Sequence, residues 1–207
     1  MPERRAPQQL RAQRTRRHLL AAAQRVFAQA GYPGATVDAL AEAAGCSKGA
    51  YYFHFSAKED VFLALIDDWT ERQSQRLAAA ADGGRPAEAL LDLLDALYSF
   101  EASDGWEPRL LLEFWSQGER NPEVARRLGR AHRSWRRLLA QAFRRAQEAG
   151  PIAPAVAAEA AAEAALALHH GLVVQACLGA VTRASTRGRA RAVLALLVGP
   201  KALRRAG

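Results

Sequence analysis

Four side chains between residues 48 and 58 are of the kinds that hold phosphate groups. Lys48, Tyr52, His54 and Lys58 each offer an N–H or O–H donor, and such donors make many of the protein contacts to a nucleic-acid backbone. Gly49 has no side chain and would let the main chain approach such a ligand closely. Taken alone, Tyr52 and His54 would also fit as surface residues whose polar groups have hydrogen-bond partners without any ligand. Their place between two lysines favours phosphate contact.

The residues around these donors predict two short helices joined by a tight turn. Thr36 is a favourable N-cap for a helix over residues 37–44, and Gly45 then turns the chain. Ser47 is a favourable N-cap for a second helix over residues 48–54. Helix, short turn, helix is the geometry that sets a second helix into the major groove of DNA.

A run of fixed positions through this segment resembles the helix-turn-helix signature of the TetR family of transcriptional repressors. The match runs from residue 36 to residue 59 without a gap, so it is far more specific than a lone short motif. Outside about residues 19–65, the resemblance is one of helix pattern and length. The matching residues are Thr36, Val37, Leu40, Ala41, Ala44, Gly45, Ser47, Lys48, Gly49, Tyr52, His54, Phe55, Lys58 and Glu59.

The resemblance implies a role for each polar residue of the motif. Residues expected to grip phosphates are Thr36, Lys48, Tyr52, His54 and Lys58, and those expected nearest the base edges are Ser47, Lys48, Gly49 and Ala50. Ala50 and Phe53 replace a more frequent Thr or Ser and a common Tyr, which leaves base preference open. Ala57 stands where a capping Ser or Asn is usual, although Ser56 and Glu59 have capping-box spacing for a third helix beginning near residue 57.

Aromatic residues of the motif also have a purely structural interpretation. Tyr51, Phe53 and Phe55 could each belong to the core, because a compact three-helix unit needs an aromatic to close it. We expect Phe55 to serve as scaffold.

Charge is distributed unevenly along the 207 residues, although the formal net charge is +8. Residues 1–66 and 120–207 are basic, whereas residues 67–119 carry 12 Asp and Glu against 4 Lys and Arg. Basicity alone therefore does not locate a nucleic-acid site. An arginine-rich arm precedes the motif and suits phosphate or minor-groove contact, with a solvated leader as the alternative. Its residues are Arg4, Arg5, Arg11, Arg14, Arg16 and Arg17.

Composition indicates a globular cytoplasmic protein. With 50% hydrophobic residues, the chain can bury a real core. The first residues lack the apolar stretch of a secretory signal, and the apolar run near residues 164–181 is interrupted by histidines and glutamine, as in a buried helix rather than a membrane span. Cys46 and Cys177 lie far apart, so we expect reduced packing residues and no disulfide framework.

Apolar periodicity is helical nearly everywhere and predicts an all-α fold of about nine helices. Expected helices after the motif run from about residue 57 to 80, 86 to 102, after 108, from about 121 to 149, 155 to 178 and 186 to 203. We expect a DNA-binding domain at residues 1–55, with three helices and the basic arm, and a larger ligand-binding and dimerisation domain at residues 56–207.

The last two expected helices suggest how the protein assembles. The helix near residues 155–178 is small and apolar nearly all round, so it must be covered on more than one side. The resemblance implies that these helices pair with their copies in a homodimer, with burial inside one chain as the alternative. Two recognition helices related by a twofold axis would read an inverted-repeat operator in double-stranded DNA. The expected interface residues are Ala164, Leu168, Leu172, Gln175, Val193, Leu194 and Leu197.

An effector cavity among the later helices is likewise implied by the resemblance, with its occupation releasing DNA. The candidate lining residues also fit as ordinary core, and adjacent His169 and His170 lie about 100° apart on a helix, so they do not readily face one pocket. Aromatic residues with few acids favour a hydrophobic or acyl ligand. A stripe of arginines on the helix expected at about residues 121–149 fits either a solvated face or the binding of a phosphate-bearing effector. These arginines are Arg126, Arg130, Arg133 and Arg137. The candidates are Tyr98, Trp106, Leu111, Phe114, Trp115, Trp135, His169, His170, Val173 and Cys177.

Two other classes of protein compete with this interpretation. An enzyme using His169 and His170 is disfavoured, because the pair lacks a placed nucleophile and no hydrolase, metalloprotease or P-loop motif occurs. A metal site built from these histidines with His132 and Cys177 would need a fortunate tertiary arrangement, so no metal or cofactor is expected. The arginine-rich composition permits a nonspecific nucleic-acid-binding protein, but the acidic middle segment and the large helical second part of the chain do not require one.

Overall fold

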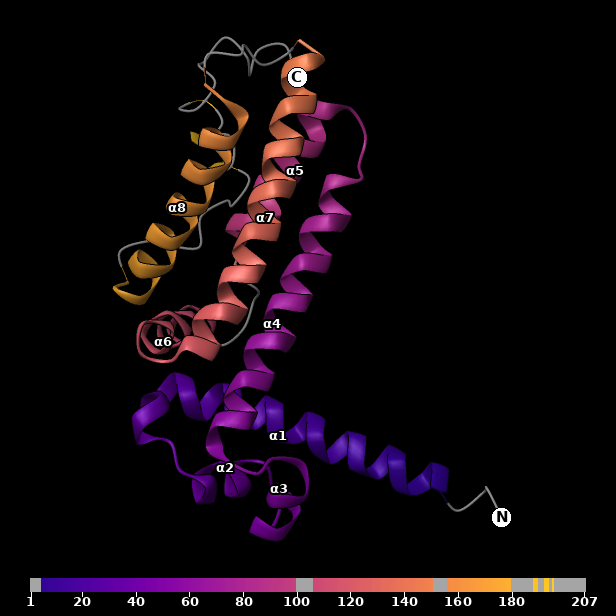
Figure 1. Cartoon of the computed structure of the whole chain (residues 1–207), viewed down its shortest axis with the longest axis vertical. Coiled ribbons are helices and arrows are strands. Elements are labelled where there is room, and N and C mark those ends of the chain that lie inside the picture. Colours follow the sequence, from indigo (N-terminus) through magenta and orange to yellow (C-terminus); the bar gives the residue numbers. More distant parts are fainter. Residues whose placement is uncertain are drawn as a thin grey trace. The chain divides into compact units, whose positions relative to one another are not determined.

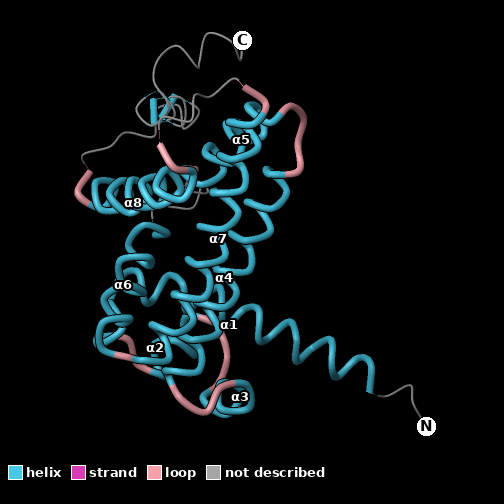
Figure 2. The backbone as a smooth tube through the Cα atoms, turned by 45° about the horizontal axis from the view of Figure 1, so that its top comes forward, coloured by secondary structure: helices cyan, strands magenta, loops and turns pink. Residues whose placement is uncertain are grey.

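Every regular element that the structure describes is a helix (Figures 1 and 2). The computed structural model describes residues 5–99, 106–150 and 156–179, together with residues 188, 189, 192, 193 and 195. Over these residues the all-α prediction is confirmed, whereas most of the helix expected at residues 186–203 lies outside them. The helices are α1 (Arg5–Gly34), α2 (Val37–Ala43), α3 (Lys48–His54), α4 (Lys58–Ala81), α5 (Pro86–Tyr98), α6 (Trp106–Arg120), α7 (Pro122–Glu148) and α8 (Ala158–Cys177).

The chain divides into two compact units, each of which takes residues from separate parts of the sequence. The first unit contains Met1–Trp69 and Ala102–Arg126, and the second contains Thr70–Glu101 and Arg127–Gly207. None of the helices in the described ranges contains an apolar stretch of the length and hydropathy that a membrane span needs.

An aromatic cluster forms the centre of the first unit. The rings of Phe27 and Phe62 meet edge to face with centroids 5.1 Å apart, and Phe62 meets Phe114 in the same way at 5.3 Å. Because such pairs add about 0.5–1.5 kcal/mol beyond their burial, they join α1, α4 and α6 firmly. Gly31, at φ +69°, interrupts the regular helix of α1 close to this cluster, as expected for a residue that ends a helix.

The second unit is built on leucines of α5 and on polar ties between helices. Leu90, Leu94 and Leu97 are fully buried, and the hydroxyl of Tyr98 donates a hydrogen bond of 3.1 Å to the carbonyl of Ala165 in α8. On the outer side of α7, arginines pair with acids of α8, namely Arg136 with Glu163 at 3.0 Å and Arg144 with Glu159.

Three sequence-based expectations differ from the structure. The helix expected to reach residue 102 ends at Tyr98, because Ser99 takes an extended ψ of 115°. The capping box of Ser56 and Glu59 is replaced by a bond one residue later, in which the backbone N–H of Ala57 donates to Asp60 at 2.9 Å. The buried face of α7 includes Leu139 and Phe143, which are absent from the apolar stripe that periodicity predicts for this helix, namely Val124, Leu128, Ala131, Trp135, Leu138, Ala142 and Ala146.

Candidate nucleic-acid interface

Two hydroxyl side chains begin the helices α2 and α3. The hydroxyl of Thr36 accepts a hydrogen bond from the backbone N–H of Ala39, and that of Ser47 accepts one from Ala50, each at 3.1 Å. Each cap satisfies a backbone donor that has no partner inside its helix and contributes about 1 kcal/mol. The N-caps predicted for both helices are therefore confirmed, and both hydroxyls have a structural role.

The turn between these helices has the hydrogen bonds of a Schellman motif. The N–H of Cys46 donates to the carbonyl of Ala41 at 3.0 Å, and the N–H of Gly45 donates to that of Glu42 at 2.9 Å. Gly45 has φ +65°, a conformation that a residue without Cβ adopts at least cost. The motif sets the angle at which α3 leaves α2.

Aromatic residues decide which face of α3 points outward. Tyr51 and Phe55 are buried, and the Tyr51 hydroxyl donates to the carbonyl of Ala57 at 3.1 Å. Tyr52 and Phe53 are 54% and 76% exposed. Phe55 is thus scaffold, as expected, whereas Phe53 is a surface residue beside Tyr52.

The two motif lysines have different surroundings. The Lys48 ammonium lies 2.6 Å from a carboxylate oxygen of Asp38 in α2, and both side chains are exposed. The Lys58 ammonium donates to the carbonyls of Tyr32 at 2.6 Å and Ala35 at 2.9 Å, and it lies 4.4 Å from the Tyr32 ring centroid. Two of the three Lys58 N–H groups therefore tie the start of α4 to the segment before α2.

The imidazole of His54 is half-buried at the end of α3. Burial, and then the charge of Arg16, lower its pKa from the usual value of 6.5. At neutral pH the ring is therefore largely neutral and offers one N–H donor.

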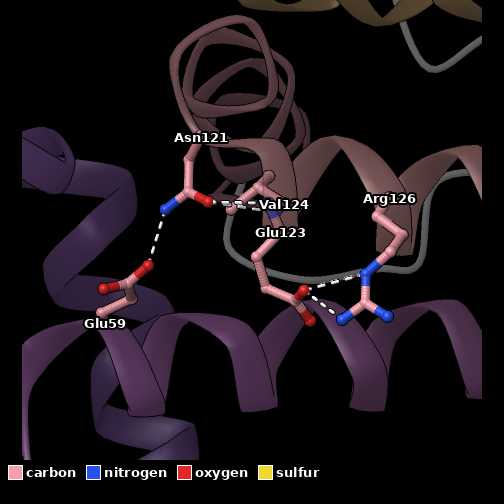
Figure 3. Close-up of polar contacts among 5 residues, drawn as sticks. All are labelled: Glu59, Asn121, Glu123, Val124 and Arg126. Carbon is pink, nitrogen blue, oxygen red and sulfur yellow. Dashed lines mark hydrogen bonds and ion pairs between the residues drawn. The ribbon is translucent and has the colours of Figure 1, made fainter.

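Just beyond Lys58, the first unit connects α4 to the start of α7 (Figure 3). The side-chain amide of Asn121 donates to Glu59 at 2.6 Å, while its carbonyl oxygen accepts from the backbone N–H groups of Glu123 and Val124 at 2.9 and 3.3 Å. Asn121 thus caps α7 and holds the first turn of α4 at the same time. This contact has no sequence signature, since its partners are 62 residues apart.

The expected effector residues are distributed between the two units. Leu111 and Phe114 are buried in the first unit, where Trp115 is half-buried, and the side chain of Trp106 lies outside the described part. In the second unit Tyr98, Trp135, His169 and Val173 are buried, whereas His170 and Cys177 are half-buried.

A cavity of about 290 Å³ opens between α7 and α8 in the second unit. The Nε2 atoms of His170 and His132 lie 3.0 Å apart beside it, so one imidazole donates to the other. Burial lowers the pKa of His132 to about 4 and that of His169 to about 3, which keeps both rings neutral at pH 7. His169 is buried while His170 lines the cavity, as their separation on a helix predicts. The lining residues are His132, Arg133, Arg136, Glu163, Leu166, Ala167 and His170.

Metal ligands are not gathered at this cavity. Among the described residues, no group of three or more His, Cys, Asp or Glu is placed to hold a metal ion.

Residues expected in a dimer interface lie mainly along one side of α8. Leu168 is 39% exposed, Gln175 is exposed, and Ala164 and Leu172 are half-buried. Val193 is buried, whereas Leu194 and Leu197 lie outside the described part of the chain.

Family models match both parts of this sequence. The model for bacterial regulatory proteins of the tetR family matches residues 19–65, and the model for the C-terminal part of BetI-type transcriptional repressors matches residues 86–199. Among characterised proteins, the HTH-type transcriptional regulator UidR of Escherichia coli K12 is 30% identical over 165 residues, which cover 80% of this chain and 83% of UidR.

Solved structures show the same architecture. Salmonella enterica GusR is 27% identical with a TM-score of 0.69, over 89% of this chain and 95% of GusR. A regulator from Saccharomonospora viridis in complex with choline has a TM-score of 0.75 at 23% identity, over 88% and 94% of the two chains. FadR from Bacillus subtilis in complex with stearoyl-CoA has a TM-score of 0.73 at 20% identity, over 88% and 97%. The last two likenesses support the fold alone.

Proposed function

Because this chain belongs to the tetR family of bacterial regulatory proteins, and is thus a DNA-binding transcriptional regulator rather than an enzyme, we propose that it is a homodimeric repressor released from an inverted-repeat operator by a hydrophobic effector. The observation that carries the DNA-binding part is the exposed face of α3. Tyr52 and Lys48 lie on that face, while Tyr51 and Phe55 anchor the helix from behind.

In this proposal α3 lies in the major groove. Ser47, Lys48, Gly49 and Ala50 lie nearest the base edges, and phosphates are held by Lys48 and by Thr36, Tyr52, His54 and Lys58. The donor types, the exposure of Tyr52 and Lys48, and the match to the family's DNA-binding model support this assignment. Functionally, residues 1–55 are the DNA-binding domain and residues 56–207 bind effector and partner, in the cytoplasm.

The DNA contact is tested by Lys48→Ala. Loss of one phosphate contact should weaken binding to every sequence and reduce the magnitude of the salt slope, d log K/d log[salt], by about one. Arg85→Ala, a change at an exposed residue between α4 and α5, is the control. Competition between retained genomic fragments and random DNA at fixed salt separates a specific regulator from a nonspecific binder. A well-folded Lys48→Ala protein with unchanged affinity and slope would show that α3 is not the recognition helix.

Dimerisation is proposed through α8, with Val193, Leu194 and Leu197 of the segment that follows. The exposure of Leu168 and the half-burial of Leu172 support this assignment, because an apolar helix side needs cover. Leu168→Glu should place an unpaired charge in the interface and yield monomers with weakened operator binding. Ser134→Glu is the control, because it adds the same charge at an exposed position of α7, outside the proposed interface. Light scattering that finds the Leu168→Glu protein still dimeric would exclude this side of α8.

We assign the effector to the second unit, with an acyl compound as the leading class. The support is the cavity between α7 and α8, where Arg133, Arg136 and His170 offer donors to a carboxylate or phosphate head beside the apolar Leu166. A 100-fold release of DNA requires about 2.7 kcal/mol of preference for the conformation that does not bind DNA. That preference must come from contacts made in the second unit.

Titration decides the effector class. Fatty acids, their CoA esters and choline are added separately while tryptophan emission and operator release are both followed. An acyl compound should change emission and release DNA, and Arg133→Gln should weaken that response more than Arg145→Gln, a change at an exposed arginine of the same helix. Emission change without release identifies a bound compound that is no effector. Response to choline alone would overturn the acyl assignment and leave the regulator assignment intact.

A further inference from the structure

An exposed ion pair joins α2 and α3, the two helices of the proposed DNA-binding helix-turn-helix. Asp38, in the first turn of α2, places a carboxylate oxygen 2.6 Å from the Lys48 ammonium at the start of α3. Both side chains are solvent-accessible, with 65% and 60% of their surface exposed. Because an exposed ion pair changes a folding equilibrium by only about one- to fivefold, this pair has little importance for stability.

Other contacts already hold the two helices together. Leu40 and Ala41 of α2 and Tyr51 of α3 are buried, and the Schellman turn at Gly45 and the N-caps fix the relative orientation of the two helices. The ion pair is thus dispensable for the fold and lies on the surface that faces solvent. Because this surface contains the proposed phosphate contact of Lys48, the ion pair can affect DNA binding.

A DNA phosphate and the Asp38 carboxylate would compete for the same ammonium group. Both are anions that accept charge-assisted hydrogen bonds, and each repels the other at short range. From this geometry we infer that Asp38 acts as an internal substitute for phosphate: it holds Lys48 in the free protein and lowers the affinity for all duplex DNA by the same factor. This inference rests on the proposed phosphate contact of Lys48.

Uniform weakening has a functional consequence. The proposed phosphate contact of Lys48 is the same in operator and random DNA, so a change in that contact leaves the ratio of the two affinities unaffected. Absolute retention on random DNA falls, and this matters because nonspecific sites vastly outnumber operators in a genome. Asp38 thus shortens the time that the protein spends on random DNA without changing which sequence it prefers.

The size of the effect follows from counterion release. Freeing Lys48 adds up to about one phosphate neutralisation, which steepens the salt slope by up to about 0.9. Between 50 and 200 mM salt, a slope change of about 0.9 alters relative affinity about 3.5-fold. Asp38→Asn should therefore increase affinity for operator and random duplex equally, by about 3- to 10-fold at 50 mM salt, with most of the gain lost at 200 mM.

The test measures operator and random-duplex affinity for Asp38→Asn at several salt concentrations, with thermal unfolding as a check of the fold. Asp38→Ser, which also suits the first turn of a helix, is the second variant if the asparagine perturbs α2. Glu42→Gln is the matched control, since Glu42 is an exposed acid one turn further along α2. Its effect should stay below about twofold, the long-range contribution of one screened charge.

A double-mutant cycle shows whether Asp38 acts through Lys48. In a Lys48→Met background, the gain from Asp38→Asn should fall to the level of Glu42→Gln. A gain that persists there would mean that the carboxylate repels DNA directly, and an equal gain from Glu42→Gln would mean that net charge alone acts. Reduced affinity in Asp38→Asn would mean that Asp38 positions Lys48 in the complex. Each of these three results overturns the inference, whereas an unaffected Lys48→Ala protein overturns the proposed contact itself.

Discussion

Replacing His132 by glutamine should make the protein less sensitive to acid. The imidazole of His132 is bonded to His170 at 3.0 Å and lies edge to face with Trp135, with ring centroids 5.4 Å apart. Burial, followed by the neighbouring His170, lowers the pKa of His132 from 6.5 to about 4. The unfolded chain therefore takes up a proton below about pH 6.5 that the folded chain accepts only near pH 4.

The sign and size follow from proton linkage. Because the unfolded state binds more protons between pH 6.5 and 4, the free energy of unfolding falls as the pH falls through this range. At pH 5 the loss from His132 is about 2 kcal/mol, since each pKa unit corresponds to about 1.4 kcal/mol. Glutamine has no such titration but retains a group that can bond to His170. The variant's stability should therefore decline less from pH 7 to pH 5, by up to about 2 kcal/mol.

Urea unfolding followed by circular dichroism, at fixed protein and salt concentrations, measures this difference. The range of pH 7 to 5 is chosen because most carboxylates of the unfolded chain titrate below it. His18→Gln removes an exposed imidazole of α1 instead and is the matched control. If His132→Gln and the parent protein lose stability in parallel over this range, burial of the neutral His132 ring is not a source of acid sensitivity.

Four further outcomes are expected. Tyr98→Phe removes the donor to the buried carbonyl of Ala165 and should lower the free energy of unfolding by about 1–2 kcal/mol in denaturant titration. Lys58→Met removes two charge-assisted hydrogen bonds to backbone carbonyls and should lower the free energy of unfolding by about 2–4 kcal/mol. If the variant instead loses operator affinity while its thermal stability is unchanged, the structural role of Lys58 is refuted. Thr36→Ala should cost about 1 kcal/mol and Thr36→Ser much less, as measured by thermal unfolding. Burial and the charge of Arg16 lower the pKa of His54 in the free protein, and a phosphate contact would raise that pKa in the complex, so operator affinity should increase as the pH falls from neutrality into the acid range. The increase should be at most about tenfold per pH unit, and His54→Asn should abolish it in fluorescence anisotropy.

Local interactions made the α2–turn–α3 segment predictable from the sequence. The caps at Thr36 and Ser47 each span three residues, and the turn at Gly45 depends on a single positive φ. Such features follow from the dihedral and hydrogen-bonding preferences of a few neighbouring residues, so their sequence pattern specifies them nearly alone. Phe55 is predictable as scaffold for the same reason, whereas the exposure of Phe53 depends on how α3 is oriented.

Contacts between distant residues were decided by the tertiary structure alone. Lys58 reaches the carbonyl of Tyr32 across 26 residues, and His132 reaches His170 across 38. Neither pairing has a sequence signature, because helix periodicity specifies which face is apolar but not which residue of another helix lies opposite it. The sequence by itself determined the all-α pattern, the N-caps of α2 and α3 and the donor types of α3. Packing determined which donors remain exposed, which are tied to the backbone, and which histidines stay neutral, because these properties depend on distances that only the folded chain sets.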